Sequence, residues 1–179
     1  MIEVKELTTR DISDDILLKF SHHQEITKKW VNRNNTWELS DTFDLREWNE
    51  EKRIWISGYL RQQIERGGSL AAAFDSNIIV GFCCVDGCLA GNTAAYANMT
   101  MLFVDDKWKR RGVGRKLFER ICMCAAKMKA EKLFISAIPS SETIAFYFKM
   151  GCEDAKEIIP EYVDTDQDRY LEYTLTTLI

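Results

Sequence analysis

The sequence has few of the residues that interrupt or divide a folded chain. Its 179 residues include only two prolines and no stretch rich in serine, proline and glycine, so no linker is indicated. No apolar run approaches the roughly 18 residues of a membrane-spanning helix, and residues 1–7 lack the apolar core and cleavage site of a signal peptide. We therefore expect a single domain, residues 1–179, that is cytoplasmic and does not bind a membrane.

Metal ligands and an excess of basic residues are missing as well. The six cysteines form no CxxC pair, and His22 and His23 lie far from them in the sequence, so no metal site is expected. We expect the cysteines to be reduced and to pack in the core as small hydrophobic side chains. The formal net charge is −4, whereas nucleic-acid-binding domains are typically basic, so no nucleic-acid partner is expected.

The chain does contain alternating strand and helix patterns. Strands are predicted at 2–7, 69–74, 78–85, 94–104, 133–138, 157–159 and 170–176, and helices near 11–20, 45–66, 112–128 and 141–150. Residues 22–35 fit neither pattern. The mixture of hairpin strands and strand–helix–strand units predicts an α/β fold, with a mixed sheet and helices on its faces.

Two of these predictions are specific. Asp44 and Glu47 form the pattern of a capping box, which starts the second helix at Leu45. In the strand 94–104, strict alternation places one set of side chains on each face. One set is Tyr96, Asn98, Thr100 and Leu102, and the other is Ala97, Met99, Met101 and Phe103.

Positive charge is concentrated between the 94–104 strand and the helix that follows it. Six of the 24 lysines and arginines fall within Lys107–Lys116, together with Gly112 and Gly114. Glycines let a ligand approach the backbone N–H groups, and the start of a helix adds unpaired donors and the positive end of its dipole. The segment is therefore predicted to bind an anionic group such as phosphate.

The two best-known phosphate loops do not explain this segment. No P-loop sequence occurs, and Gly112-Val113-Gly114 lacks the third glycine of the dinucleotide-binding fingerprint. A solvated basic turn before an ordinary helix is one alternative. Nucleic-acid binding by the basic run is another, although no interleaved aromatic residues support it.

The same residues resemble a signature of the GNAT superfamily of acyl-CoA-dependent N-acyltransferases. That signature, Arg/Gln-x-x-Gly-x-Gly/Ala after a strand, matches Lys109–Gly114, with lysine at the first position. The segment Ser140–Cys152 resembles a second family block, Asn-x-x-Ala-x-x-Phe-Tyr-x-Lys-x-Gly-Phe. Its matching residues are Phe146, Tyr147, Lys149 and Gly151, while Ser140, Thr143 and Cys152 replace the Asn, the Ala and the final Phe.

The resemblance implies a fold and a set of binding residues. The central sheet would be mixed and mostly antiparallel, with helices on both faces. Its fourth and fifth strands, 94–104 and 133–138, would splay apart to admit the pantetheine arm. Backbone groups of Phe103 and Val104 would pair with the amides of that arm, and Ser140 is a further expected contact. The diphosphate would lie on the turn formed by Lys109, Arg110, Arg111, Gly112, Val113, Gly114 and Arg115.

The resemblance also assigns part of the chemistry. Tyr147 matches the tyrosine that protonates the departing thiolate, although core packing beside Phe146 and Phe148 is the plain alternative. The base is not identified, and at neutral pH an amine of pKa about 10.4 needs one. Many relatives use a carboxylate on the fourth strand, where this chain has none. The remaining alternatives are Asp86, Glu38, Glu172 and an ordered water.

The histidines and tryptophans have two interpretations each. His22 and His23 invite a catalytic role, but their polar surroundings favour exposed positions. Four tryptophans precede the predicted hairpin: Trp30, Trp37, Trp48 and Trp55. They indicate either an aromatic acceptor pocket or, at least for Trp48 and Trp55, core packing.

These expectations describe an N-acetyltransferase that moves an acetyl group from acetyl-CoA to a primary amine. The acidic chain favours a cationic small molecule as acceptor. A protein amine as acceptor, acyl groups other than acetyl, and a homodimer stay open. The alternative is a non-catalytic acyl-CoA-binding or sensory module of the same fold.

Overall fold

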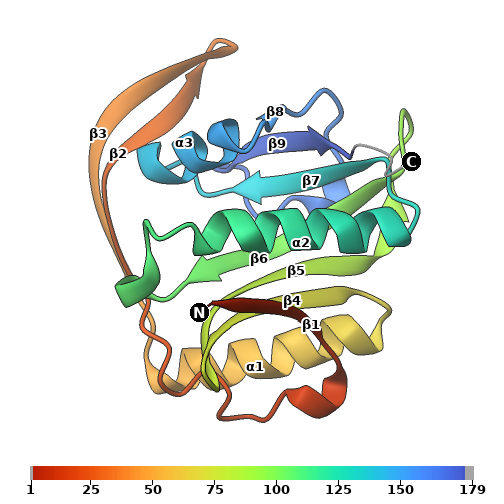
Figure 1. Ribbon diagram of the computed structural model, residues 1–179. Helices are drawn as coiled ribbons and strands as arrows, with labels where there is room; N and C mark the ends of the chain where they lie inside the picture. The colour runs from red at the N-terminus through yellow and green to blue at the C-terminus, as the bar shows by residue number, and fades with distance from the viewer. Residues whose placement is uncertain (1, 176–179) are drawn as a thin grey trace.

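The computed structural model describes residues 2–175, which form a seven-stranded sheet and a separate two-stranded hairpin (Figure 1). The strand order in the sheet is β1-β4-β5-β6-β7-β9-β8. The strands are β1 (Glu3–Leu7), β2 (His23–Arg33), β3 (Thr36–Glu47), β4 (Ser69–Asp75), β5 (Ile78–Ala90), β6 (Tyr96–Val104), β7 (Lys132–Ala137), β8 (Glu153–Asp154) and β9 (Arg169–Thr174). The α-helices are α1 (Glu50–Glu65), α2 (Val113–Lys127) and α3 (Ser141–Lys149). Short 3₁₀ turns lie at η1 (Thr9–Asp11), η2 (Asp106–Trp108) and η3 (Pro160–Tyr162).

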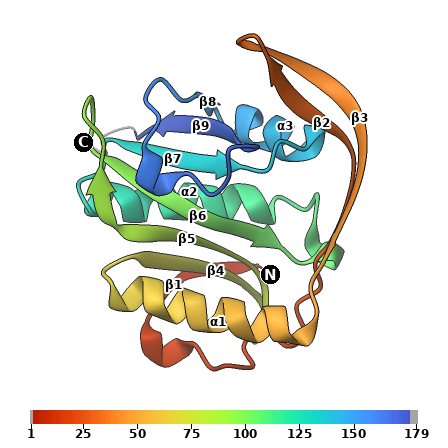
Figure 2. The same cartoon turned by 180° about the vertical axis from the view of Figure 1, so that it is seen from behind.

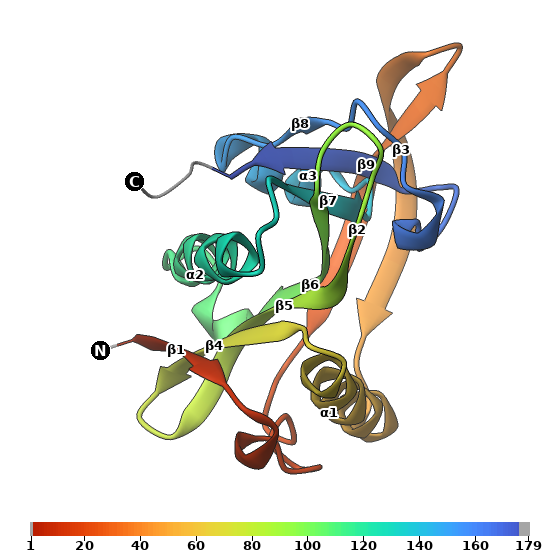
Figure 3. The same ribbon diagram turned by 90° about the vertical axis from the view of Figure 1, so that its right-hand side faces the viewer.

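The sheet separates two layers of helices, as expected. Alternate residues of β5 point to opposite faces: Cys83 packs with α2, and Phe82 packs with α1. In the view along the sheet, α2 and α1 lie on either side of it (Figure 3). Within residues 2–175, no helix is both long and apolar enough to cross a membrane.

The strands β6 and β7 form the only parallel pair among the described strands, and they separate along their length. They pair at Tyr96↔Lys132, Ala97↔Leu133 and Asn98↔Phe134. Beyond these residues β6 continues to Val104 and β7 to Ala137 without pairing to each other. We call the paired part the closed end and the separated part the open end. The predicted mixed, mostly antiparallel sheet with two splayed strands is confirmed.

The start of α1 differs from the prediction. Asp44 and Glu47 lie in β3, and α1 begins at Glu50, where the side chain of Asn49 accepts the Lys52 amide at 2.8 Å. The capping-box pattern was misleading because an equivalent cap lies five residues later. Strands β2 and β3 form a long hairpin, called the arm, which runs along one side of the molecule past α3 (Figure 2).

Other segments were placed wrongly or incompletely. The helix expected near 11–20 is absent: η1 ends at Asp11, and turns follow it. The strand expected at 157–159 is also absent, and β8 lies earlier, at Glu153–Asp154. Strand β5 extends to Ala90 instead of ending at Val85. The predicted end of the last strand at Thr176 lies outside the described residues.

Strand β6 does not alternate strictly, because it contains a bulge. Met101 lies opposite Cys84 and Met99 lies opposite Val85, which leaves Thr100 as the extra residue. A bulge reverses which face the following side chains occupy. Accordingly Met99 packs on the α2 face, as Leu102 and Val104 do, while Met101 and Phe103 pack on the α1 face. The predicted two sets of faces were therefore wrong beyond Thr100.

Candidate functional site

The open end presents an unpaired strand edge beside the bulge. Residues 99–104 of β6 have β5 as a neighbour on one side, but β7 has moved away on the other. Backbone groups along such an edge are available to hydrogen bond with an extended ligand, as an added strand would. Phe103 and Val104, which were predicted to bind pantetheine, lie on this edge.

The chain leaves β6 through a tight turn that leads directly into α2. The side chain of Asp105 accepts the Lys107 amide at 3.0 Å and so starts η2. Arg110 and Gly112 then adopt positive φ angles of 61° and 78°, and α2 begins at Val113. The first amides of an α-helix have no partner inside the helix, and the helix dipole adds positive potential there. The open end therefore terminates in a site suited to an anion.

The two glycines of the turn have different roles. Gly112 has the left-handed conformation that glycine adopts without strain, and a Cβ atom there would meet open space. A Cβ atom on Gly114 would lie 3.2 Å from the ring of Phe146. Gly114 therefore lets α3 pack closely against the start of α2, a role different from the ligand approach expected of it.

The basic side chains of the turn fall into two groups. Lys109 donates to the His23 carbonyl at 2.9 Å and pairs with Asp106, so it fastens the arm to the turn. The Arg111 guanidinium lies 5.1 Å from the centre of the Trp108 ring. Arg110 and Arg115 are exposed, and among residues 2–175 neither forms an ion pair or a side-chain hydrogen bond. They are the cations of the turn best placed to meet a ligand.

Arg115 also borders a groove between α2, α3 and β9. The groove has a volume of about 350 Å³, and Phe118, Cys122, Met150 and Tyr173 contribute to its walls. Lys149 stands with Arg115 among the residues that line it. A groove of mixed polarity, lined by these two cations and by Glu119 as well as by apolar side chains, lies next to the predicted diphosphate turn.

Ser140 and Tyr147 occupy defined positions on α3. Ser140 is fully buried and caps the helix by accepting the Thr143 amide at 3.1 Å. The Tyr147 side chain is 7% exposed, and its ring packs against Phe118 and Phe146. Burial, followed by the nearby thiols of Cys83 and Cys152, raises the pKa of Tyr147 well above its ordinary value. The phenol is therefore protonated at neutral pH.

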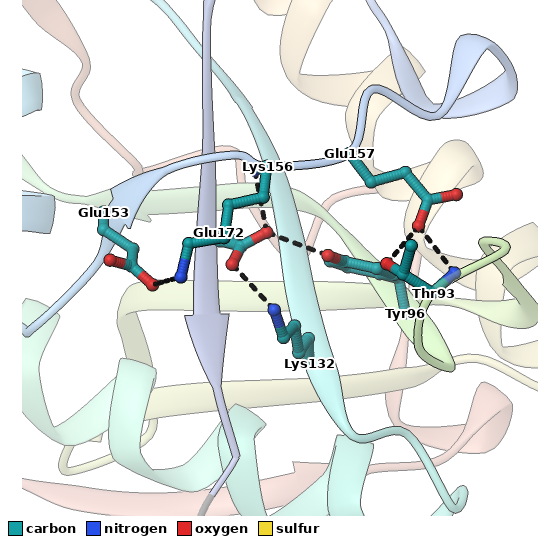
Figure 4. A network of polar contacts seen from close by, with 7 residues as sticks. All are labelled: Thr93, Tyr96, Lys132, Glu153, Lys156, Glu157 and Glu172. Carbon is teal, nitrogen blue, oxygen red and sulfur yellow. Dashed lines mark hydrogen bonds and ion pairs between the residues drawn. The ribbon is translucent and has the colours of Figure 1, made fainter.

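Glu172, an alternative for the base, is used inside the fold (Figure 4). It is completely buried and accepts from the Tyr96 hydroxyl at 2.8 Å, from Lys132 Nζ at 2.8 Å and from the Lys156 amide at 3.0 Å. Burial opposes its ionisation, but these hydrogen bonds outweigh burial and lower the pKa of Glu172. The network joins β6, β7 and β9 at the closed end, away from the open end.

The other proposed bases are separated from one another. Glu38 is exposed near the tip of the arm and lies 3.8 Å from Arg33. The Asp86 carboxylate accepts the Cys88 amide at 3.0 Å in the outer part of β5. The charge of Asp86 raises the pKa of Tyr59, a side chain of the open end that contacts the bulge residue Thr100.

The two histidines differ from the expectation that both are exposed. His23 is exposed, but His22 is 7% exposed and packs against Trp48 and Phe103. Burial, followed by the charge of Lys109, lowers the pKa of His22 to about 4. His22 is thus neutral at physiological pH and belongs to the core under the turn.

The tryptophans do not form one pocket. Trp48 packs in the α1 core, while Trp30 and Trp37 enclose the Arg169 guanidinium at 5.2 and 4.6 Å. Trp55 is more than half exposed on α1 and stacks on Tyr59. The arm crosses the open end between these groups, since Trp30 donates its amide to the Pro139 carbonyl at 2.7 Å. Trp55 is joined to the bulge region through Tyr59, whereas Trp48 packs against Phe103 of β6.

The cysteines and potential metal ligands form no separate centre in residues 2–175. All six cysteines are free thiols; Cys83, Cys84, Cys124 and Cys152 are buried. Burial raises the pKa of Cys84 to about 12, as expected for an unreactive core thiol. No group of His, Cys, Asp and Glu in the described residues is arranged to hold a metal ion.

The comparison with known families identifies the domain. Residues 66–153, from the end of α1 to the first residue of β8, match the family model of the acetyltransferase (GNAT) domain. The chain thus contains a GNAT acetyltransferase domain. The matched segment contains both splayed strands, the basic turn, α2 and α3. No curated protein sequence matches the chain.

Solved structures with this GNAT fold cover almost the whole chain. Nourseothricin acetyltransferase is 13% identical, with a TM-score of 0.70, and the match covers 98% of this chain and 99% of that one. A candidate streptothricin acetyltransferase from Bacillus anthracis str. Ames, in complex with acetyl coenzyme A, is 17% identical with a TM-score of 0.67 over 97% and 99%. An aminoglycoside 6′-N-acetyltransferase complexed with coenzyme A is 12% identical with a TM-score of 0.60 over 97% of both chains. At these identities the likeness is one of fold.

Sequence reasoning missed the residues that frame the bulge. Tyr59 was assigned only to a helix face, and Ser136 and Asp164 were not singled out. No local motif marks these residues, because they come together only when α1, β7 and the loop after η3 meet at the open end.

Proposed function

We propose that this GNAT protein transfers an acetyl group from acetyl-CoA to a primary amine of a small molecule. The observation that carries the proposal is the open end itself. There an unpaired strand edge, a bulge and a glycine-containing basic turn at a helix start lie in succession. This arrangement suits a ligand with an extended amide-containing arm and a diphosphate, which is the chemistry of a coenzyme A thioester.

The donor lies along β6 in this proposal. The amides of the pantetheine arm pair with the backbone groups around Phe103 and Val104 that point into the gap and not to β5. The diphosphate meets the first amides of α2 and the side chains of Arg110 and Arg115, while Lys109 acts by holding the turn. Charge-assisted hydrogen bonds to phosphate are stronger than neutral ones, so these contacts contribute much of the affinity. The groove beside Arg115 can receive the part of the coenzyme beyond the diphosphate.

The reaction follows from this placement. The free amine nitrogen attacks the thioester carbonyl carbon, the C–N bond forms, the C–S bond breaks, and the nitrogen loses a proton to solvent. Backbone N–H groups freed by the bulge at Thr100 stabilise negative charge on the carbonyl oxygen. Tyr147, protonated at neutral pH, gives its proton to the departing thiolate and regains one from solvent.

The acceptor is proposed to be a cationic small molecule. The chain carries a net charge of −4, which attracts cations. Two of the structural neighbours are described as acting on nourseothricin and on aminoglycosides. A non-catalytic acyl-CoA-binding module is the second candidate, and it is favoured by the absence of a carboxylate on β6.

Calorimetry with acetyl-CoA, combined with thiol release over a panel of amines, tests the proposal. Tyr147→Phe should bind acetyl-CoA normally but lose about 100-fold or more in turnover. Tight binding with no turnover on any amine would instead identify the binding module.

Charge reversal tests the placement of the diphosphate. Arg110→Glu with Arg115→Glu should weaken acetyl-CoA binding at least about tenfold, or roughly 1.4 kcal/mol. The matched control is Lys127→Glu with Lys129→Glu, which makes the same change of charge at the other end of α2. Equal losses in the two double variants would contradict the assigned site.

A further inference from the structure

The two splayed strands carry polar side chains at the same height on the face opposite α2. The paired residues of the closed end differ by 36 in number, as in Asn98↔Phe134. Continuing that register brings Thr100 of β6 level with Ser136 of β7. Thr100 is the bulge residue, so these two residues border the gap at the point where the thioester is proposed to react.

On the β7 side, Ser136 holds the loop that follows η3. Its Oγ accepts the Asp164 amide at 3.1 Å and donates to the Asp168 carboxylate at 2.8 Å. The loop is fixed at two further points, because the Tyr162 hydroxyl donates to the Cys88 carbonyl at 2.6 Å and the Tyr170 hydroxyl donates to the Thr165 carbonyl at 2.9 Å. The backbone of Asp164 is therefore attached to the wall of the gap.

On the β6 side, Tyr59 of α1 covers the bulge. Burial raises the pKa of the Tyr59 phenol, its contact with Thr100 lowers that pKa, and the charges of Asp164 and Asp86 raise it further. The Asp164 carboxylate is therefore close enough to Tyr59 to act on its phenol electrostatically, and the backbone of Asp164 is held at the gap by Ser136.

The two carboxylates of the loop differ in their bonding. Asp168 accepts a hydrogen bond from Ser136, and Thr165 donates to it at 3.4 Å. Asp164 is exposed, and among residues 2–175 its carboxylate accepts no hydrogen bond. Partial desolvation of its carboxylate, followed by the charge of Asp168, raises the pKa of Asp164, so it is a stronger base than an ordinary aspartate.

We propose that the Asp164 carboxylate is the base that receives the proton of the acceptor ammonium, with Tyr59 on the other side of the gap. This inference rests on the proposed acetyl transfer. The ammonium binds beside Asp164 on the α1 face while the thioester approaches from the α2 face. Its proton passes to Asp164, which releases it to solvent, and the free amine attacks the carbonyl carbon. The adduct nitrogen then gives its second proton to Asp164, from which it also passes to solvent, while the departing thiolate takes its proton from Tyr147. A loop carboxylate thereby replaces the acid that β6 lacks.

The test compares Asp164→Asn with Asp166→Asn, which makes the same change two residues away on the loop. The probes are nourseothricin, an aminoglycoside and spermidine, with thiol release followed from pH 6 to 10. Asp164→Asn should lower kcat about 100-fold or more at pH 7. That loss should shrink as the pH approaches 10, because the amine then deprotonates without a base. Acetyl-CoA affinity and the unfolding midpoint should stay unchanged, and Asp166→Asn should behave like the unsubstituted protein.

Each outcome has one meaning. If Asp164→Asn keeps kcat within threefold at pH 7 in a protein that is otherwise active, the assignment of the base is wrong and the acetyl transfer stands. If Asp164→Asn and Asp166→Asn lose activity equally, the effect is one of general charge and the assignment is again wrong. If the unsubstituted protein binds acetyl-CoA but acetylates none of the probes, the proposed function fails, and Asp164 has no such role.

Discussion

At the closed end, strands β6 and β7 are joined by three residue pairs and by the buried Glu172 network. At the open end, the same two strands do not pair with each other. The closed end consists of hydrophobic side chains such as Phe134 and Tyr162 and of the Glu172 carboxylate, which accepts three hydrogen bonds. The open end has a bulge, free backbone groups and exposed cations. A rigid joint at one end therefore holds two strands apart at the other.

The difference shows why Glu172 and Asp164 play different parts although both are acids near β7. Glu172 accepts three hydrogen bonds and carries a lowered pKa, so it is poorly suited to take a proton. Asp164 has a raised pKa, and its backbone is held at the gap by Ser136. The surroundings of each carboxylate, more than its residue type, decide whether it holds strands together or is suited to take up a proton.

Breaking the closed end should have the largest effect on stability. Glu172→Gln removes the negative charge beside the Lys132 ammonium and replaces one of the two acceptor oxygens with an NH2 group. Breaking a buried ion pair by removing one partner costs about 3–5 kcal/mol. Urea unfolding should show a loss of about this size. The control Tyr96→Phe removes a single hydrogen bond and should cost about 1 kcal/mol. A loss below 1 kcal/mol in Glu172→Gln would show that the network does not hold the strands together.

Loosening the arm should have a smaller effect, confined to the open end. Arg169 is 5% exposed, binds Asp154 through two hydrogen bonds and lies against Trp30, Trp37 and Phe148. Arg169→Met removes the charge-assisted hydrogen bonds and the cation–π contacts, which together contribute about 2 kcal/mol. Amide hydrogen exchange should accelerate in β2 and β3, with the closed end unchanged. Faster exchange at Tyr96–Asn98 would contradict the separation of the two ends.

The smallest expected effect is a change in the pH dependence of stability at the closed end. Hydrogen bonds from the Thr93 hydroxyl and from the amides of Asn92 and Thr93 lower the pKa of Glu157 from 4.5 to about 2. A lowered pKa contributes stability above the unfolded pKa, and that contribution is lost as the pH falls from about 4.5 to about 2. In Glu157→Gln, the free energy of unfolding should therefore depend less on pH within this window. An unchanged pH dependence would show that the hydrogen bonds between Glu157 and the loop at Thr93 contribute nothing to stability.

Sequence reasoning predicted local features better than features that depend on tertiary contacts. Gly112 and the basic residues marked the start of α2, and Ser140 marked the cap of α3, because caps and turns depend on neighbouring residues. The capping box at Asp44 was wrong, since its pattern fits a strand in the arm as well. The bulge at Thr100 left no mark in the alternation, although it decides which side chains face the gap. Tyr59, Ser136 and Asp164 are distant in sequence, so no spacing rule could join them.

Amide hydrogen exchange with and without acetyl-CoA tests the open end most directly as the donor site. At saturating acetyl-CoA, the β6 amides of residues 99–104 that face the gap should exchange at least about tenfold more slowly, because the pantetheine arm pairs with that edge. The amides of Tyr96–Asn98 should be unchanged, since β7 already pairs with that segment. Saturation that leaves residues 99–104 unaffected, or protection that appears only elsewhere, would contradict the placement of the donor between the splayed strands.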